Sequence, residues 1–321
     1  MAIIGTDIDK VVDLLNRGDL VSIPTETVYG LAGNALNPEA VTKIFTVKNR
    51  PTFDPLIVHV ASLSDARNFA EGINSQAREL AEHFWPGPLT LLLPKKEIIP
   101  DIVTAGLDRV GIRCPDHSLT RKLLNRIGFP LAAPSANPFG YVSPTTPQHV
   151  QEQLGDRIPY ILDGGPCHVG IESTIVGWED GKPVIYRMGG VSIEEIQDII
   201  GPVIVTAFSS SQPQAPGQLQ SHYAPKRKVF AGDVEELYTR LKPSKPGVLL
   251  YRKKAISFKA QPIHVLSATG DLNEGARNLF GMLRAFDHAD VDVVLAEFVP
   301  DVGLGRAIND RLRRASHLVI G

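Results

Sequence analysis

Two cationic side chains, Lys48 and Arg50, stand at the expected end of a helix, shortly before Pro51. Cations in a last helical turn commonly complement the negative end of the helix dipole, which gives this pair a purely structural explanation. Because proline disfavours helical backbone at the residue before it, a frayed last turn would also let both side chains reach one anion. A lysine point charge and an arginine fork together suit a polyphosphate. The pair therefore predicts a phosphate site, with complementation of the dipole as the alternative.

Short polar side chains follow a buried strand expected at 131–133. Ser135 and Asn137 stand between two prolines, and Ser143 comes soon after them. Ligands of open α/β sheets bind at the carboxyl ends of strands, where hydroxyl and amide groups can donate to phosphate oxygens. A turn in which these side chains satisfy their own backbone is the alternative. The cluster predicts a second part of the same anion site.

Four further polar residues stand at or beside expected strands, namely Thr27, His59, Arg113 and Ser173. An arginine at a strand end can hold a carboxylate through two parallel hydrogen bonds, although a surface ion pair would explain Arg113 as well. A lone histidine in a strand, such as His59, is more often structural than catalytic. No Ser–His–Asp or Cys–His nucleophile is evident. These groups favour positioning and charge neutralisation, as in nucleotidyl transfer, over covalent catalysis.

Familiar cofactor motifs are missing from the sequence. No Gly-x-x-x-x-Gly-Lys-Ser/Thr loop occurs, and Gly303-x-Gly305 lacks the third glycine of a dinucleotide fingerprint. A nucleotide site must therefore be built differently. The spacing of two cysteine–histidine pairs is unusual for zinc, so we assign no metal to protein side chains; the pairs are Cys114 with His117 and Cys167 with His168.

The elements that must position these groups alternate between helix and strand. Apolar spacing indicates a helix over 8–15 with Thr6 as its cap, and Asn37 before Pro38 is typical of the start of another. Asp180-Gly181 between two apolar runs predicts a hairpin, so we expect a mixed sheet in an α/β fold. Further helices are expected over 75–84 and 118–127, and strands over 20–23, 56–60, 89–93, 110–113 and 131–133.

The chain is long enough for two domains. Its 321 residues contain a stretch too polar and too broken by proline for a helix or a strand, which we interpret as a linker over 202–227. Residues 1–201 form the first expected domain, and 228–321 form a second, smaller parallel α/β domain. Our hypothesis is that the linker closes over the active site.

Charge and cysteine content exclude several classes of protein. Residues 1–201 hold 17 Lys and Arg against 24 Asp and Glu, a net charge of −7, whereas 202–321 hold 16 against 11, a net charge of +5. Neither half is a polybasic module. Two cysteines are too few for a disulfide framework, and no signal segment or membrane span is recognisable, so we expect a cytoplasmic protein without a membrane partner. Proline is abundant, with 17 of 25 before residue 202, and would stiffen the loops of the first half.

Several motifs occur in an order that resembles one family. They are Ser22–Leu31, Lys48-x-Arg50, Pro55–His59, Trp85–Thr90, Ser135–Asn137 and Glu172–Ile175. Together they resemble the YrdC-like family of L-threonylcarbamoyladenylate synthases over about residues 5–200. His222-Tyr223-Ala224-Pro225 in the linker and the second domain look like the two-domain branch of that family. The resemblance implies a YrdC-like twisted, open, mixed sheet with helices, followed by a smaller Rossmann-like parallel α/β domain.

The resemblance also implies a nucleotidyltransferase. The enzyme would join L-threonine, bicarbonate and ATP, the latter with Mg²⁺, into threonylcarbamoyl-AMP and pyrophosphate. Downstream tRNA threonylcarbamoyl-transfer proteins would use the product to modify adenosine 37 of tRNA, and any contact with tRNA itself would be indirect. An RNA-binding module and a carbamoyl transferase for another acceptor are the alternatives, although the net charge of −7 argues against broad binding to an RNA backbone.

Individual roles follow from the family pattern. The catalytic residues would be Lys48, Arg50, Ser135 and Asn137. ATP would be bound by these four together with Asp54, Arg109, Ser143, Arg187 and Tyr223. L-Threonine would be held by Thr27, His59, Arg113 and Ser173.

Overall fold

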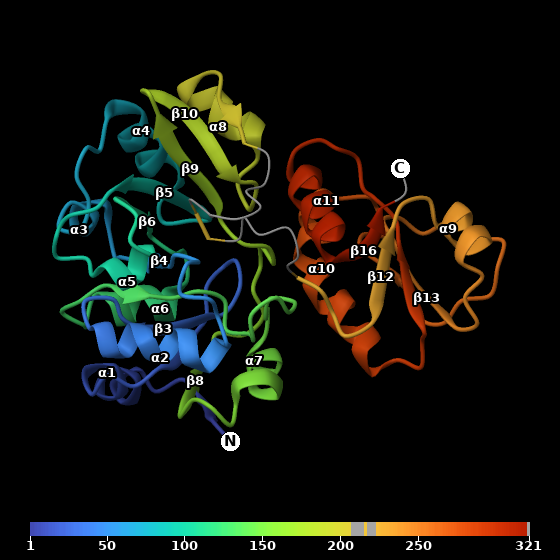
Figure 1. Ribbon diagram of the computed structural model, residues 1–321, viewed down its shortest axis with the longest axis horizontal. Helices are drawn as coiled ribbons and strands as arrows, with labels where there is room; N and C mark the ends of the chain where they lie inside the picture. The colour runs from blue at the N-terminus through green and yellow to red at the C-terminus, as the bar shows by residue number, and fades with distance from the viewer. Residues whose placement is uncertain (207–214, 217–222, 320–321) are drawn as a thin grey trace. The chain divides into compact units, whose positions relative to one another are not determined.

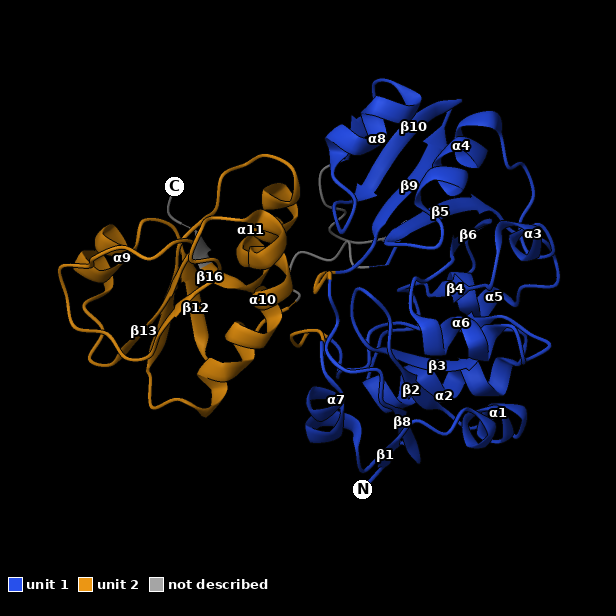
Figure 2. Ribbon diagram, turned by 180° about the vertical axis from the view of Figure 1, so that it is seen from behind, with its two compact units in different colours: residues 1–139, 144–168, 172–220 blue, residues 140–143, 169–171, 221–321 orange. Residues whose placement is uncertain are grey.

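The computed structural model describes residues 1–206, 215–216 and 223–319. The chain forms two compact units, shown in different colours in Figure 2. The first comprises Met1–Phe139, Pro144–His168 and Glu172–Gln220, and the second comprises Gly140–Ser143, Val169–Ile171 and Ser221–Gly321. Most of the expected linker, at 207–214 and 217–222, lies outside the described residues. Its closure and the domain bounds 1–201, 202–227 and 228–321 stay predictions.

The first unit is built on a mixed sheet of eleven strands in the order β1-β8-β2-β3-β7-β4-β6-β5-β9-β10-β11 (Figure 1). The strands are β1 (Ile3–Gly5), β2 (Val21–Ile23), β3 (Gly30–Asn34), β4 (Ile57–His59), β5 (Leu89–Pro94), β6 (Arg109–Arg113), β7 (Leu131–Ala132), β8 (Tyr160–Leu162), β9 (Thr174–Glu179), β10 (Lys182–Arg187) and β11 (Ile204–Val205). The helices are α1 (Ile8–Asn16), α2 (Pro38–Lys48), α3 (Leu63–Ala66), α4 (Ser75–Phe84), α5 (Asp101–Thr104), α6 (Ser118–Leu124), α7 (Pro147–Leu154) and α8 (Ile193–Ile200).

Apolar residues of the sheet alternate between two cores. Leu31 of β3 packs with residues of α2 and α4, whereas the next residue, Ala32, packs with residues of α1 and α6. Successive side chains of a strand point to opposite faces, so each face of the sheet acquires its own apolar layer. The expected α/β layering of the first half is therefore confirmed.

Local capping explains where two helices begin. The side chain of Asn37 accepts hydrogen bonds from the backbone N–H of Glu39 and Ala40, and Pro38 is the first residue of α2, as predicted. The prediction that Thr6 caps α1 is wrong, because Asp7 is the cap and accepts from the backbone N–H of Lys10 at 3.1 Å. A carboxylate at this position also complements the positive end of the helix dipole.

Two further expectations concern element ends. The hairpin between β9 and β10 is confirmed, since Asp180 and Gly181 both have positive φ, of 47° and 76°, as a two-residue turn of this kind requires. Helix α6 ends at Leu124, before the expected residue 127.

No helix of the described residues is long and apolar enough to cross a membrane.

The second unit contains a parallel sheet of five strands in the order β14-β13-β15-β12-β16. Its strands are β12 (Lys228–Ala231), β13 (Pro246–Leu250), β14 (Ile263–Val265), β15 (Val293–Ala296) and β16 (Ser316–Val319). Its α-helices are α9 (Val234–Leu241), α10 (Leu272–Ala285) and α11 (Leu304–Ala315). The alternation of strand and helix produces the smaller parallel α/β fold that the sequence predicted.

Candidate active site

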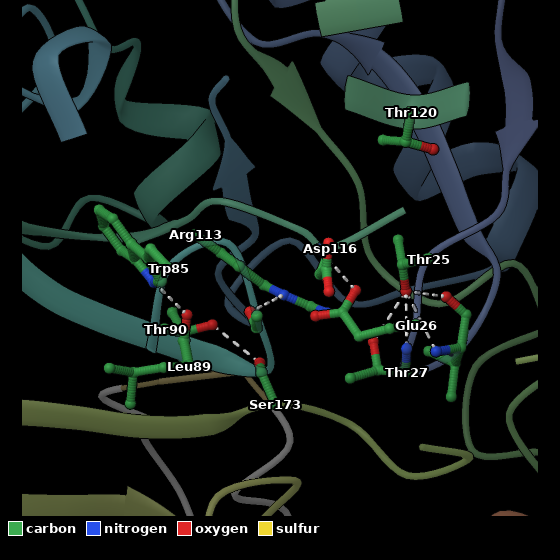
Figure 3. A network of polar contacts seen from close by, with 12 residues as sticks. Thr25, Glu26, Thr27, Trp85, Leu89, Thr90, Arg113, Asp116, Thr120 and Ser173 are labelled. Carbon is green, nitrogen blue, oxygen red and sulfur yellow. Dashed lines mark hydrogen bonds and ion pairs between the residues drawn. The ribbon is translucent and has the colours of Figure 1, made fainter. Parts of the chain in front are cut away.

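A row of polar side chains crosses neighbouring strands of the first unit. His59 of β4 lies opposite Arg113 of β6, which in turn lies opposite Thr90 of β5. Residues directly opposite each other on adjacent strands project from the same face of the sheet. Ser173, just before β9, extends the row, because its Oγ lies 2.8 Å from Oγ1 of Thr90 (Figure 3). Strand pairing thus assembles groups that are far apart in the sequence.

Arg113 is buried and forms an ion pair with a buried carboxylate. Its Nη2 lies 2.7 Å from Oε1 of Glu26, and the two side chains are 5% and 1% exposed. The other carboxylate oxygen of Glu26 accepts from the backbone N–H of Asp116 at 3.1 Å (Figure 3). A buried charge is tolerated only when it is paired, so Glu26 is what allows the guanidinium to lie here. The pair is therefore internal, unlike the surface ion pair considered from the sequence.

The guanidinium of Arg113 has capacity left for a ligand. Its Nε donates to the carbonyl of Gly87 at 3.4 Å, and no acceptor among the described residues contacts Nη1. A guanidinium has five N–H donors in a fixed fork. Arg113 can therefore bind a carboxylate while it remains paired with Glu26.

The hydrogen bonds of Thr25 determine whether the hydroxyl of Thr27 donates or accepts. Oγ1 of Thr25 donates to the carbonyl oxygen of Val28 at 2.6 Å, because a carbonyl can only accept. The same Oγ1 accepts from the backbone N–H groups of Thr27 and Val28, each at 3.2 Å, and lies 2.8 Å from Oγ1 of Thr27. Because its one proton is given to Val28, Thr27 is the donor in the contact between the two hydroxyls. The hydroxyl proton of Thr27 is used within the protein, and its lone pairs are what it can present to a ligand.

His59 is neutral. It is 2% exposed, and burial, followed by the nearby charge of Arg113, lowers its pKa to about 3. Its Nδ1 makes no hydrogen bond with any described residue. An uncharged imidazole beside the Arg113 guanidinium adds polarity to the row without adding charge repulsion.

Lys48 holds the loop that carries two other predicted site residues. Its Nζ donates to the backbone carbonyls of Ser135 and Asn137, each at 2.5 Å, and the residue is 1% exposed. Burial, together with the charge of Arg50, lowers the pKa of Lys48 below its usual value. Helix α2 ends at Lys48, because the next residue, Asn49, adopts a left-handed backbone conformation with a φ of 51°. The last turn thus ends in a defined cap and not in the frayed turn that was expected.

Arg50 is paired with Asp54. Its Nη2 lies 2.9 Å from Oδ2 of Asp54, and the same nitrogen donates to the carbonyl of Pro55 at 2.8 Å. Its guanidinium also lies over the ring of Phe139. Asp54 is fully buried and neutralises the arginine. The predicted phosphate contacts of Lys48, Arg50 and Asp54 stay predictions.

Arg187, which is predicted to bind ATP, forms hydrogen bonds with Ser173, which is predicted to bind L-threonine. Its Nε and Nη2 donate to the carbonyl and to Oγ of Ser173, both at 3.0 Å. Its Nη1 donates to the carbonyl of Pro216 at 3.2 Å, and Ala215 is buried against the sheet in the same unit. The backbone at 215–216 therefore contacts Arg187 directly.

The remaining predicted nucleotide residues are Arg109, Ser143 and Tyr223. Arg109 is at the opposite end of β6 from Arg113, about 13 Å along the strand, where it donates to the hydroxyl of Tyr186 at 2.8 Å. Ser143 and Tyr223 belong to the second unit. There Tyr223 is buried, has a φ of 69° and stacks on Phe280 with ring centroids 5.5 Å apart. The roles assigned to these three residues stay predictions.

No group of three or more His, Cys, Asp or Glu side chains is placed to hold an ion within the part of the chain that the structure describes. Mg²⁺ in nucleotide sites commonly keeps several waters and binds through phosphates plus one or two carboxylates, so a cage of protein ligands is not required. Binding of Mg²⁺ together with ATP stays a prediction.

Sequence reasoning missed two residues of this site. Glu26 and Thr90 were identified only as parts of the motifs Ser22–Leu31 and Trp85–Thr90, yet they contact Arg113 and Ser173 respectively. Thr90 would have been found from the register of β5 and β6, which places it opposite Arg113. Register depends on strand pairing and cannot be read from a single strand.

Comparison with known proteins identifies the family. The Sua5/YciO/YrdC family model, described as telomere recombination, matches residues 13–189. The model of the threonylcarbamoyl-AMP synthase C-terminal domain matches residues 191–317. The threonylcarbamoyl-AMP synthase of Pyrococcus abyssi is 42% identical over 94% of this chain and 92% of its own length. That of Bacillus subtilis is 41% identical over 94% of this chain and 91% of its own.

A solved structure agrees with these matches. The crystal structure of P. abyssi Sua5 complexed with L-threonine superimposes with a TM-score of 0.91 at 38% identity and covers all of both chains. The similarity in sequence and structure therefore includes both units of this chain and not the first unit alone. The chain therefore belongs to the Sua5/YciO/YrdC family, in the two-domain branch that carries a threonylcarbamoyl-AMP synthase C-terminal domain.

Proposed function

We propose that this protein is a nucleotidyltransferase that forms threonylcarbamoyl-AMP and pyrophosphate from L-threonine, bicarbonate and ATP. The proposal is supported by the names of relatives that match nearly the whole chain and by the L-threonine complex of the P. abyssi neighbour. The product would supply the threonylcarbamoyl modification of adenosine in tRNA through separate transfer proteins. Two unpaired, buried cysteines are compatible with the cytoplasm as its location.

One observation carries the proposal, namely the buried Arg113 with Thr27 and the cross-strand row around it. Arg113 supplies donors suited to a carboxylate, whereas Thr27 supplies lone pairs suited to a hydroxyl or amine N–H. An amino acid carries a carboxylate and an amine, and threonine adds a hydroxyl. The arrangement therefore matches an amino acid substrate better than a nucleic acid backbone, which would require exposed cations.

The reaction would proceed in two bond-forming steps. The threonine amine attacks the carbon of bicarbonate, water is lost, and a carbamate results. A carbamate oxygen then attacks the α-phosphorus of ATP, and pyrophosphate leaves with the electron pair of the broken P–O bond. Both reactants of the second step are anions, so their approach requires nearby positive charge.

Residues of the first unit would provide that charge and hold the geometry. Lys48, Arg50 and Arg187 are the predicted cations for the phosphates, and Lys48 also holds the backbone of Ser135 and Asn137. Arg113 would hold the threonine carboxylate. When bound with ATP, Mg²⁺ would neutralise part of the phosphate charge.

A direct assay tests the proposal. The full chain is incubated with ATP, bicarbonate and labelled L-threonine, and pyrophosphate and labelled adenylate are measured together. Both products are expected in equal amounts, and omission of bicarbonate should remove both. Arg113→Lys is a matched variant, because it keeps the charge but loses the planar fork, and should raise the threonine KM. Wild-type protein that releases no pyrophosphate above background over a range of Mg²⁺ and pH would reject the proposed function.

A further inference from the structure

Two hydroxyls in the cross-strand row are buried together. Oγ1 of Thr90 lies 2.8 Å from Oγ of Ser173, and both residues are 0% exposed. Figure 3 shows them next to each other on neighbouring segments of chain. Thr90 lies on β5, between β6 and β9, and makes no other side-chain hydrogen bond with any described residue.

A count of protons shows that this pair lacks an acceptor. Nη2 of Arg187 already donates to Oγ of Ser173 at 3.0 Å. The two hydroxyls carry one proton each, and the contact between them uses only one of the two. No described residue accepts the other proton. A buried hydroxyl proton without a partner is unfavourable, so the pair calls for an acceptor from outside the chain.

Only one direction of the pair satisfies every proton when a ligand binds at Ser173. If Ser173 donated to Thr90, the proton of Thr90 would remain buried among neighbouring strands without an acceptor. If Thr90 donates to Ser173, both lone pairs of Ser173 are used, by Thr90 and by Arg187, and its own O–H is left for the ligand. Donation in sequence along such a chain also strengthens each hydrogen bond.

We propose that Thr90 is a positioning residue that makes Ser173 a hydrogen-bond donor to an anionic oxygen of the substrate. The inference rests on the proposed function, which puts the carboxylate of threonine and the oxygens of bicarbonate in this site. Either oxygen has the required chemistry, and kinetics can separate them. Thr90 acts through Ser173 and does not touch the substrate.

The test compares Thr90→Val, which keeps the shape and removes the hydroxyl, with Thr90→Ser, which keeps the hydroxyl. Loss of one oriented hydrogen bond is expected to raise the KM of one anionic substrate by about 3- to 10-fold. A raised threonine KM assigns the carboxylate, and a raised bicarbonate KM assigns the carbamate oxygen. The KM for ATP should not change, and Thr90→Ser should stay within about twofold of wild type.

Thr104→Val is the matched control. Thr104 is also 0% exposed, and its hydroxyl donates to the carbonyl of Leu107 at 2.8 Å, outside the row. The Thr104→Val variant also loses one buried hydroxyl, but the KM values for L-threonine, bicarbonate and ATP should stay unchanged. Both tryptophans, Trp85 and Trp178, belong to the first unit, so their fluorescence checks that each variant is folded there.

A double-mutant cycle separates positioning from general packing. If Thr90 acts only through Ser173, Thr90→Val should have no further effect on threonine binding, measured by calorimetry, in a Ser173→Ala background. An undiminished effect in that background would overturn the inference. So would Thr90→Val kinetics equal to those of Thr104→Val, or Thr90→Ser as impaired as Thr90→Val. An inactive wild type would instead reject the proposed function and is seen in the same assay.

Discussion

Replacing Glu26 by alanine would remove one partner of a buried ion pair and leave the other charged. Glu26 and Arg113 are almost completely inaccessible, with 2.7 Å between Oε1 and Nη2. Arg113 cannot lose its proton in the range of pH at which the protein is folded. The variant therefore retains a buried guanidinium whose counter-charge has gone, and the backbone N–H of Asp116 loses its acceptor as well.

The expected effect is large. Removal of one partner from a buried pair typically costs about 3–5 kcal/mol of unfolding free energy. For a unit of about 200 residues, each 1 kcal/mol lowers Tm by about 2–4 °C, so Glu26→Ala should lower the Tm of the first unit by about 6–20 °C. Removing both charges, as Glu26→Leu with Arg113→Met, should recover much of this loss, because no unpaired charge stays buried.

Tryptophan fluorescence provides the assay, since both tryptophans, Trp85 and Trp178, report on the first unit. Asp9→Asn is the control, because Asp9 pairs with Arg126 at the surface and should contribute at most about 1 kcal/mol. The reasoning is refuted if Glu26→Ala melts with the control, or if the double substitution costs as much as the sum of its two single substitutions.

Three further predictions concern the same unit. His59 has a pKa of about 3 when folded and an ordinary value of 6.5 when unfolded, so the unfolded chain binds more protons between these values. Its contribution to stability is lost as pH falls from about 6.5 to about 3, and His59→Gln should flatten the dependence of unfolding free energy on pH in urea titrations. An unchanged slope would contradict this. Lys48→Ala should lower both the activity and the stability of the protein. The free energy of unfolding should fall by about 2–6 kcal/mol, because two buried carbonyls, of Ser135 and Asn137, lose their donor. A urea midpoint of Lys48→Ala equal to that of wild type would show that Lys48 does not hold this loop. Serine should be the leading wrong substrate, with kcat/KM about 10- to 200-fold below threonine because it lacks one methyl group, and valine should be worse still. Valine used better than serine would reject this site.

Candidate site residues could be predicted from the sequence where a polar or charged side chain stands at the end of an expected strand. Arg113 and Ser173 were identified on that basis, and the structure brings both into one row with His59. The start of α2 was equally clear, since Asn37 before Pro38 satisfies local rules that need no tertiary contact. Predictions of this kind depend only on a few neighbouring residues.

Other features depend on contacts between distant segments. Strand β3, Gly30–Asn34, contains two glycines and no clear alternation, and it was not predicted. A Cβ at Gly33 would lie 2.8 Å from Cδ2 of Leu20, so close packing between strands explains a residue that local propensity disfavours. Capping of α1 by Asp7 instead of Thr6 is a smaller error with a local cause, because two adjacent residue types both suit the position.

The polarity of two hydroxyls restricts how an amino acid can lie in the site. Thr27 must donate to Thr25 and so presents lone pairs, whereas Ser173, if Thr90 donates to it, presents a proton. A ligand must therefore bring a donor to one hydroxyl and an acceptor to the other. Serine meets both requirements, but valine has no side-chain hydroxyl and must rely on its amine alone. The expected order of substrates therefore follows from the acceptor role of Thr27 toward the side-chain hydroxyl, whereas the Ser173 proton serves an anionic oxygen that all three amino acids share.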